Sequence, residues 1–251
     1  MKRLKNLMCA VLLGTAAAGN AMAADITVSA ASSLTNAFQE IGRQFEKERP
    51  QDRVLFNFGS SGQLVQQIVR GAPVDVFASA DEDSMNKAEK EGAIDRPSRF
   101  DFARNLLVLI VPVDSRLTVR TLRDVSQPAF GRIAIGNPDS VPAGRYAKAA
   151  LEKAGLWSAL QDRLVNTVNV RQALDYVARG EADAGFVYGS DARLMPSRVR
   201  SALEVEVPQP ILYPVAVVRG GGNRSGGAAF VAYLKSRAAL DILVKYGFQT
   251  P

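Results

Sequence analysis

Short apolar runs rich in β-branched residues alternate along this chain with segments whose apolar residues have helical spacing. The run DITVSAA at 25–31 is followed by apolar residues at positions 34, 37, 38, 41 and 45. The run RVLFNFG at 53–59 is followed by a second such segment that stops at Gly71, and DVFASA at 75–80 comes next. Strand, helix, strand in this order predicts an α/β fold with parallel strands and right-handed crossovers.

The same alternation continues through the middle of the chain, so the strands are too many for one compact sheet. The further apolar runs are 105–112, 132–138, 182–190 and 213–218. We therefore expect two lobes joined by extended crossings near Asn105 and Ile211. The first lobe would hold residues 24–104 plus 212–251, and the second residues 105–211. The glycine-rich stretch RGGGNRSGG at 219–227 is predicted to be a mobile loop.

The first 23 residues are predicted to be a signal peptide rather than part of the fold. Three cations precede a short apolar run, and the run ends at the small-residue sequence AMA at 21–23. Removing them lowers the net charge from +6 to +3 and removes Cys9, which is the chain's only cysteine. We expect a mature protein without disulfides that is soluble in the bacterial periplasm.

Absent residue types exclude several kinds of chemistry. The chain contains no histidine, and the mature part contains no cysteine, so neither a Ser-His-Asp nor a Cys-His catalytic device can form. Zinc would find only carboxylates, and GSSGQ at 59–63 lacks the G-x-S-x-G pattern of hydrolases. No basic run interleaved with aromatics suggests nucleic acid. We expect no enzymatic activity and no cofactor.

Four predicted helices begin with small or hydroxyl residues and no charge at the turn. Unpaired N–H groups and the helix dipole make such a beginning a ready anion site. A plain N-cap is the alternative for each serine pair, and a plain turn is the alternative for VPAG. The four junctions are Ser32-Ser33, Ser60-Ser61, VPAG at 141–144 and NTVNV at 166–170.

Three further side chains near these junctions each have two possible roles. Tyr188 ends a predicted strand, where it serves either as a ligand or as a tyrosine at the edge of the core. Arg145 and Arg171 lie one residue inside two of the helices. They would be either direct charge ligands or surface and supporting residues, and arginine is in any case a good helix former.

The chain contains the segments AASSLTNAFQEI, FGSSGQLVQQIVRGAPVDVFASAD, GNPDSVPAGRYAKAAL, NVRQAL and GFVYGSDA. Together they resemble the periplasmic molybdate-binding proteins of ABC importers. The resemblance covers essentially the whole mature chain. It implies a two-lobed periplasmic-binding-protein fold of type II, in which the chain crosses twice between lobes. It also implies a tetrahedral oxyanion held in the cleft with no metal other than its own molybdenum.

Carried over by position, the resemblance implies five molybdate-binding residues. Ser33 and Ser61 would each give a hydroxyl and a backbone N–H, Ala143 and Val170 a backbone N–H, and Tyr188 its phenol. The first two would belong to one lobe and the other three to the second. This chain has Gly62 where some relatives have a third serine, a change expected to be harmless, and Arg145 where some have an apolar residue.

The implied function is a receptor that binds molybdate, and also tungstate, and delivers it to a membrane permease with a cytoplasmic ATPase. A monomer is expected. The alternative is a receptor for another tetrahedral oxyanion such as sulfate. A pocket with donors and few acceptors would reject hydrogen phosphate, whose proton needs an acceptor, and Asp139 is the residue that could supply one. A secreted hydrolase and a regulatory effector domain are the rivals from other classes.

Overall fold

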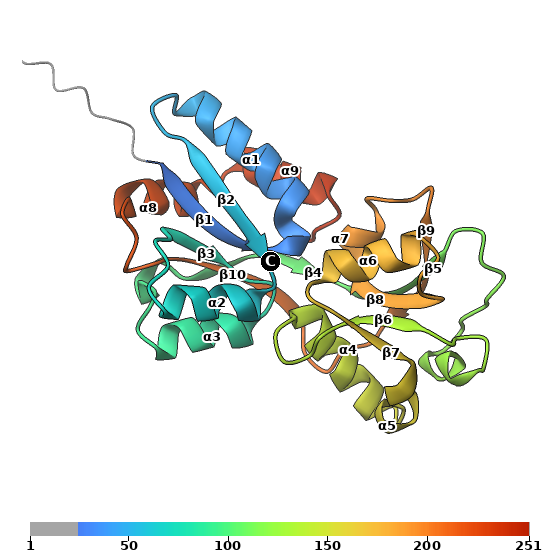
Figure 1. Cartoon of the computed structure of the whole chain (residues 1–251). Coiled ribbons are helices and arrows are strands. Elements are labelled where there is room, and N and C mark those ends of the chain that lie inside the picture. Colours follow the sequence, from blue (N-terminus) through green and yellow to red (C-terminus); the bar gives the residue numbers. More distant parts are fainter. Residues whose placement is uncertain (1–24, 251) are drawn as a thin grey trace, which may run out of the picture.

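The computed structural model describes residues 25–250, so the expected signal peptide and Cys9 lie outside the described residues. Within this range the chain forms two lobes, each built on one five-stranded sheet with helices on its faces (Figure 1). No helix in the described range is long and apolar enough to cross a membrane.

The first lobe contains the sheet with strand order β2-β1-β3-β10-β4. β1 pairs in parallel with β2 and β3, whereas β10 runs antiparallel between β3 and β4. Its elements are β1 (Ile26–Ala31), η1 (Ser32–Leu34), α1 (Thr35–Glu48), β2 (Val54–Gly59), α2 (Ser61–Val69), β3 (Val76–Ala78), α3 (Glu82–Lys90), η2 (Arg96–Ser98), β4 (Phe100–Asn105), β10 (Ile211–Val217), α8 (Arg224–Tyr233) and α9 (Arg237–Lys245).

The second lobe repeats this arrangement with strand order β7-β6-β8-β5-β9. β6 pairs in parallel with β7 and β8, and β5 runs antiparallel between β8 and β9. Its elements are β5 (Leu107–Pro112), η3 (Leu122–Ser126), β6 (Ile133–Gly136), α4 (Pro142–Lys153), α5 (Trp157–Leu160), η4 (Gln161–Arg163), β7 (Leu164–Thr167), α6 (Val170–Ala178), β8 (Ala184–Tyr188), α7 (Gly189–Ala192) and β9 (Val199–Val205).

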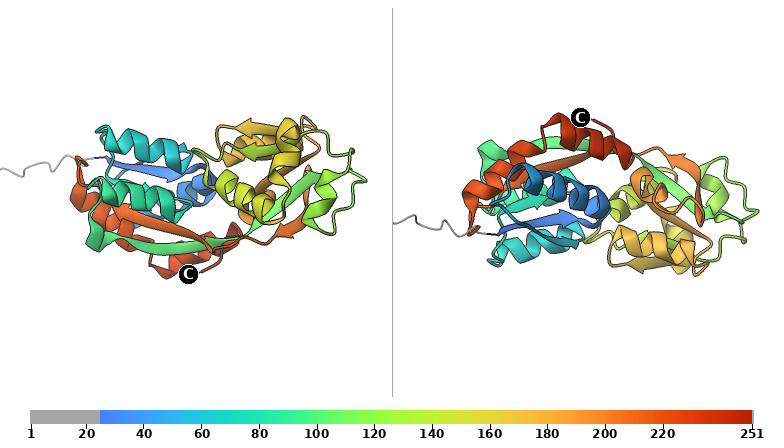
Figure 2. Two further views of the ribbon diagram at one scale, coloured as in Figure 1. Left: turned by 90° about the horizontal axis from the view of Figure 1, so that it is seen from below. Right: turned by 90° about the horizontal axis from the view of Figure 1, so that it is seen from above.

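Two segments carry the chain between the lobes. β4 ends at Asn105 and β5 begins at Leu107, while β9 ends at Val205 and β10 begins at Ile211. Both crossings run along the same side of the molecule, where Figure 2 shows the green and orange strands passing from one lobe to the other. The predicted α/β fold with two lobes and two crossings is confirmed.

Apolar helix faces pack on the sheets as the helical spacing predicts. α1 buries Ala37, Phe38, Ile41 and Phe45, which lie on one face because a helix turns every 3.6 residues. The ring of Phe38 lies 5.5–6.2 Å from three other phenylalanine rings, which fasten α1 to β2, β4 and α8. Burying a side chain of this size contributes about 1.5–3 kcal/mol.

Two local expectations differ from the structure. The segment after β1 opens with a short 3-10 turn, so Ser32 and Ser33 lie inside η1, and α1 begins only at Thr35. The expected loop at 219–227 ends at Asn223, because residues 224–227 form the first turn of α8. The Asp75 carboxylate accepts hydrogen bonds from the N–H groups of Thr27 and Asn223, which fasten this stretch to β1.

Candidate functional site

The five predicted ligand residues lie where helices begin at the carboxyl ends of parallel strands. Ser33 follows β1 in η1, and Ser61 opens α2 after β2. Ala143 lies in the first turn of α4 after β6, Val170 opens α6 after β7, and Tyr188 ends β8. All five are at most 3% exposed. In open α/β sheets this edge is where ligands bind.

Neither serine pair caps its helix, so the plain N-cap alternative is wrong for both. No side-chain hydrogen bond caps η1, and Ser60 occupies the N-cap position of α2 without capping it. The Ser61 hydroxyl instead accepts a hydrogen bond of 3.0 Å from the N–H of Ala80. Its own proton therefore stays available for an anion.

Tyr188 bridges the two lobes. Its hydroxyl donates to the carbonyl of Ala80 across the lobe boundary, at 3.3 Å. This bond is long and can be exchanged for one to an anion. Burial raises the pKa of Tyr188 well above its usual range, so the phenol stays protonated and can only donate to a bare oxyanion. Ala80 thus brings Ser61 and Tyr188 to the same place.

The beginning of α4 packs directly against the beginning of α2. The N–H of Gly62 donates to the carbonyl of Ser140 at 3.0 Å, across the lobe boundary. A Cβ on Gly62 would lie 2.5 Å from that oxygen, so glycine permits this approach. A Cβ on Gly144 would lie 1.8 Å from the carbonyl oxygen of Gly136, which explains the glycine in VPAG. Ala143, in this first turn, presents an N–H that no helical carbonyl accepts.

The beginning of α6 packs against η1. The guanidinium of Arg171 reaches from α6 into the first lobe and donates to the Ser33 carbonyl at 3.1 Å and to Asn36 Oδ1 at 2.8 Å. Its Nε lies 2.6 Å from Oδ1 of Asp191, which is completely buried. Val170, the first residue of α6, has an N–H without a partner inside the helix and lies beside this bridge.

Arginine charges at the site are paired with carboxylates. Arg145 donates to Asp81 Oδ2 across the lobe boundary, at 2.8 Å from Nε and 2.5 Å from Nη2, and Arg171 pairs with Asp191. Both arginines are therefore supporting residues that join the lobes. Asp139, the possible acceptor, is exposed. The helix beginnings thus form a site without unpaired charge.

Sequence reasoning missed the residues that hold Ser33. The hydroxyl of Tyr213, on β10, lies 3.0 Å from Ser33 Oγ, and Asn105 Nδ2 donates to Tyr213 at 3.2 Å. Both residues are buried at the crossings between the lobes. Tyr213 follows Ser33 by 180 positions, and no local pattern in the apolar run 213–218 indicates that it faces a hydroxyl.

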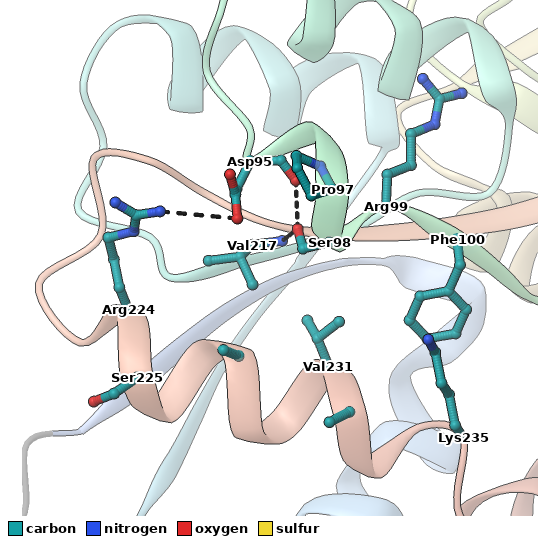
Figure 3. A pocket seen from close by; sticks show the side chains of 12 residues that line it. Asp95, Pro97, Ser98, Arg99, Phe100, Val217, Arg224, Ser225, Val231 and Lys235 are labelled. Atoms are coloured by element: carbon teal, nitrogen blue, oxygen red, sulfur yellow. Dashed lines mark hydrogen bonds and ion pairs between the residues drawn. The ribbon is translucent and has the colours of Figure 1, made fainter.

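A surface pocket of about 550 Å³ in the first lobe is a different feature. It lies between α8 and the segment from η2 to β4, and Arg224 pairs with Asp95 at 3.9 Å across it (Figure 3). Ser98 donates to the Asp95 carbonyl, and Lys235 lies 4.2 Å from the centre of the Phe100 ring. No predicted ligand residue lines it. Within residues 25–250, no cluster of three or more carboxylates could hold a metal.

Comparisons with known proteins agree with this architecture. The model of the family described as bacterial extracellular solute-binding protein matches residues 26–249. The molybdate-binding protein ModA of Escherichia coli is 42% identical, with 97% of this chain and 96% of the relative covered. ModA of Haemophilus influenzae is 34% identical, with 99% of each chain covered.

Solved structures give the same result. The periplasmic molybdate-binding protein of Azotobacter vinelandii has a TM-score of 0.80 at 27% identity, with 90% of this chain and 99% of that chain covered. The sulfate-binding protein SubI of Mycobacterium tuberculosis has a TM-score of 0.77 at 17% identity, over 90% of this chain and 86% of the other, and so shares the fold alone. The chain therefore belongs to the bacterial extracellular solute-binding protein family.

Proposed function

We propose that this protein is a periplasmic receptor that binds molybdate between its lobes and delivers it to an ABC importer. The observation that carries the proposal is the convergence of four helix beginnings and Tyr188 at one place between the lobes, without unpaired charge. The full-length relatives named as molybdate-binding proteins support the identity of the ion.

The proposed ligands are the five residues predicted from the sequence. Ser33 and Ser61 give hydroxyls and N–H groups, Ala143 and Val170 give N–H groups, and Tyr188 gives its phenol. Hydrogen bonds to a charged partner contribute about 1.5–3 kcal/mol each, so several together offset the desolvation of a dianion. Because the anion contacts both lobes, it favours the closed arrangement.

The remaining parts of the proposal follow from this role. The chain is exported by its signal peptide, acts as a monomer without a cofactor, and catalyses no reaction. Its partner is the membrane permease, whose cytoplasmic ATPase drives uptake. Tungstate, with a similar size and charge, should bind as well.

Calorimetric titration of the mature protein with molybdate, tungstate, sulfate and phosphate tests the proposal. Tight binding of molybdate and tungstate, with far weaker binding of the other two, is the expected result. Tight binding of sulfate or phosphate without molybdate would refute it and would favour the alternative oxyanion receptor.

A further inference from the structure

The direction of one buried hydrogen bond decides what Ser33 can do for an anion. Ser33 Oγ and Tyr213 Oη lie 3.0 Å apart, and either hydroxyl could donate at that distance. If Ser33 donates to Tyr213, its O–H is already engaged in that hydrogen bond and cannot donate to a ligand. If Tyr213 donates to Ser33, the serine proton is free to point at the anion.

Asn105 sets that direction, because its side-chain amide has one possible orientation. Its Oδ1 accepts from the backbone N–H groups of Leu106, at 2.9 Å, and Ser190, at 3.4 Å. A backbone N–H can only donate, so the atom facing these two groups is the oxygen. The Nδ2 atom then faces Ser190 Oγ at 2.8 Å and Tyr213 Oη at 3.2 Å, and it can only donate to them.

The chain of donors therefore runs from Asn105 to Tyr213 to Ser33. Tyr213 Oη already accepts a hydrogen bond from Asn105 Nδ2, so its own O–H donates to Ser33 Oγ, its one other hydrogen-bond partner within residues 25–250. Tyr213 is fully buried, and burial raises its pKa well above the usual range, so the phenol keeps this proton.

We infer that Asn105 and Tyr213 are positioning residues that hold the Ser33 hydroxyl as an obligatory donor to the bound oxyanion. The inference rests on the proposed function and adds the origin of its selectivity. Tyr213 occupies one of the two lone pairs of Ser33 Oγ, so this hydroxyl has one position fewer at which to accept a hydrogen bond from an anion that carries a proton.

Ser61 is held in the same way by a different group. Its oxygen accepts from the N–H of Ala80, so each of the two proposed ligand hydroxyls in the first lobe has one lone pair filled and its proton left for the anion. A fully deprotonated oxyanion matches two fixed donors. Hydrogen phosphate would leave its own proton without an acceptor, and leaving such a buried group unpaired is unfavourable.

A double-mutant cycle of Ser33→Ala and Tyr213→Phe tests whether Tyr213 acts through Ser33. In the otherwise native protein, Tyr213→Phe should weaken molybdate binding by about 5- to 20-fold. In the Ser33→Ala background the same change should weaken molybdate binding by less than about twofold, because the serine hydroxyl is already absent. Equal losses in the two backgrounds would overturn the inference.

A second readout measures selectivity. Removing the Tyr213 hydroxyl frees the Ser33 oxygen to accept a proton, so the preference for molybdate over hydrogen phosphate, measured by competition, should fall by about threefold or more. A preference that is unchanged would overturn the role in selectivity. Tyr233→Phe is the matched control, because it removes a hydroxyl that bonds Glu48 at 2.8 Å on the surface of the same lobe.

Folding is expected to survive the change at Tyr213. The ring packs 5.3 Å from Phe248 and 6.3 Å from Phe102, and phenylalanine keeps both contacts. Should the variant fail to fold, Asn105→Asp provides a second test, because the carboxylate replaces the donor with an acceptor and draws the Tyr213 proton away from Ser33. Molybdate binding should then fall more in the native background than in Ser33→Ala, and equal losses would again overturn the inference.

The wild-type titration separates this inference from the proposed function. If wild type binds a different oxyanion, the proposed identity of the ligand fails, and the cycle is run with the anion that binds. If wild type binds molybdate and Tyr213→Phe weakens binding equally in both backgrounds, Tyr213 does not act through Ser33, while the proposed function stands.

Discussion

Arg145 of the second lobe lies across the cleft from Asp81 of the first, with Nη2 2.5 Å and Nε 2.8 Å from the same carboxylate oxygen. The Asp81 side chain is only 4% exposed. Arg145 Nη2 also donates to Ser84 Oγ, in the first turn of α3, at 3.0 Å. These contacts join the lobes, so moving the lobes apart would break them.

Replacing Arg145 with alanine should therefore speed the release of molybdate. The variant leaves Asp81 buried and unpaired near a dianion, which destabilises the closed complex. We expect a release rate about 5- to 20-fold higher, which corresponds to roughly 1–2 kcal/mol for a part-buried ion pair. Displacement of labelled molybdate by an excess of unlabelled ion measures this rate.

Two variants control the Arg145 prediction. Lys153→Ala removes a cation from the same helix, α4. Lys153 pairs with the exposed Glu206, so the release rate of molybdate should not change. The double variant Arg145→Ala with Asp81→Asn should release more slowly than Arg145→Ala alone, because no unpaired charge remains. An unchanged rate in Arg145→Ala would show that the ion pair does not contribute to closure.

Replacing Ser61 with alanine should weaken both binding and folding. The sequence alone predicts a loss of about 1–3 kcal/mol in binding with folding nearly unchanged. The structure changes the expectation for folding, because alanine leaves the buried Ala80 N–H without its acceptor. The unfolding free energy should fall by about 1–3 kcal/mol. Calorimetry and urea unfolding measure the two effects.

Ser60→Ala is the matched control for Ser61→Ala. Ser60 Oγ is buried and has no hydrogen-bond partner within residues 25–250, so removing it breaks no hydrogen bond within that range. Its unfolding free energy should stay close to that of wild type. Equal destabilisation of the two variants would argue against the bond between Ser61 and Ala80.

Replacing Gly62 with serine should weaken binding in this chain, contrary to the expectation that serine and glycine are equivalent here. The new Cβ would meet the backbone of Ser140 at 2.5 Å, and a backbone oxygen cannot rotate away as a side chain can. Overpacking of this kind costs about 1–3 kcal/mol. It would destabilise the arrangement in which the two lobes are in contact, because Gly62 and Ser140 belong to different lobes. Calorimetric titration of the variant with molybdate measures this loss.

Gly220→Ser is the control for Gly62→Ser, because its Cβ would have no atom within 4 Å. Molybdate affinity should be unchanged in this control, and the unfolding free energy of both variants without ligand should stay near wild type. Native affinity in Gly62→Ser would show that the lobes close without this contact.

The stability of the first lobe should fall as pH rises toward neutrality, because of Glu82. Burial and a hydrogen bond to the Asp101 carboxyl raise the pKa of Glu82 from 4.5 to about 7. A raised pKa favours the folded state while the group is protonated. This contribution is complete below pH 4.5 and is lost as pH rises through about 7, at a cost of about 1–2 kcal/mol after solvent screening.

Glu82→Gln should remove most of that loss, since the amide stays neutral. Urea unfolding at pH values on both sides of this window measures the difference between the variant and wild type. Glu89→Gln is the control, because Glu89 pairs with the same Arg99. If Glu82→Gln keeps the wild-type pH dependence, Glu82 is not its source.

Molybdate affinity, in contrast, should be nearly constant from roughly pH 6 to 8. The chain has no histidine, and burial moves the pKa of Tyr188 further above this range. Glu82 faces Arg99 and Asp101 within the first lobe and is not a proposed ligand. Calorimetry across this range checks the expectation, and a steep change would identify a titrating group in the site.

The sequence by itself determined the elements and the helix beginnings. The alternation of apolar runs with helical spacing is a local property, so the two-lobed α/β fold and the strand-to-helix junctions at Ser33, Ser61, Ala143 and Val170 could be predicted. Signals of this kind arise within one turn or one strand, where neighbours in sequence are neighbours in space.

Only the tertiary structure decided what the side chains at these junctions do. Tyr213 meets Ser33 from 180 residues away, and Arg145 meets Asp81 from 64 residues away in the other lobe. The first contact depends on the place of β10 in the sheet of the first lobe, and the second on the packing of one lobe against the other, and no local spacing encodes either. The same packing turned apparent helix caps into oriented hydroxyl donors, because a buried hydroxyl takes its direction from the donors and acceptors that surround it.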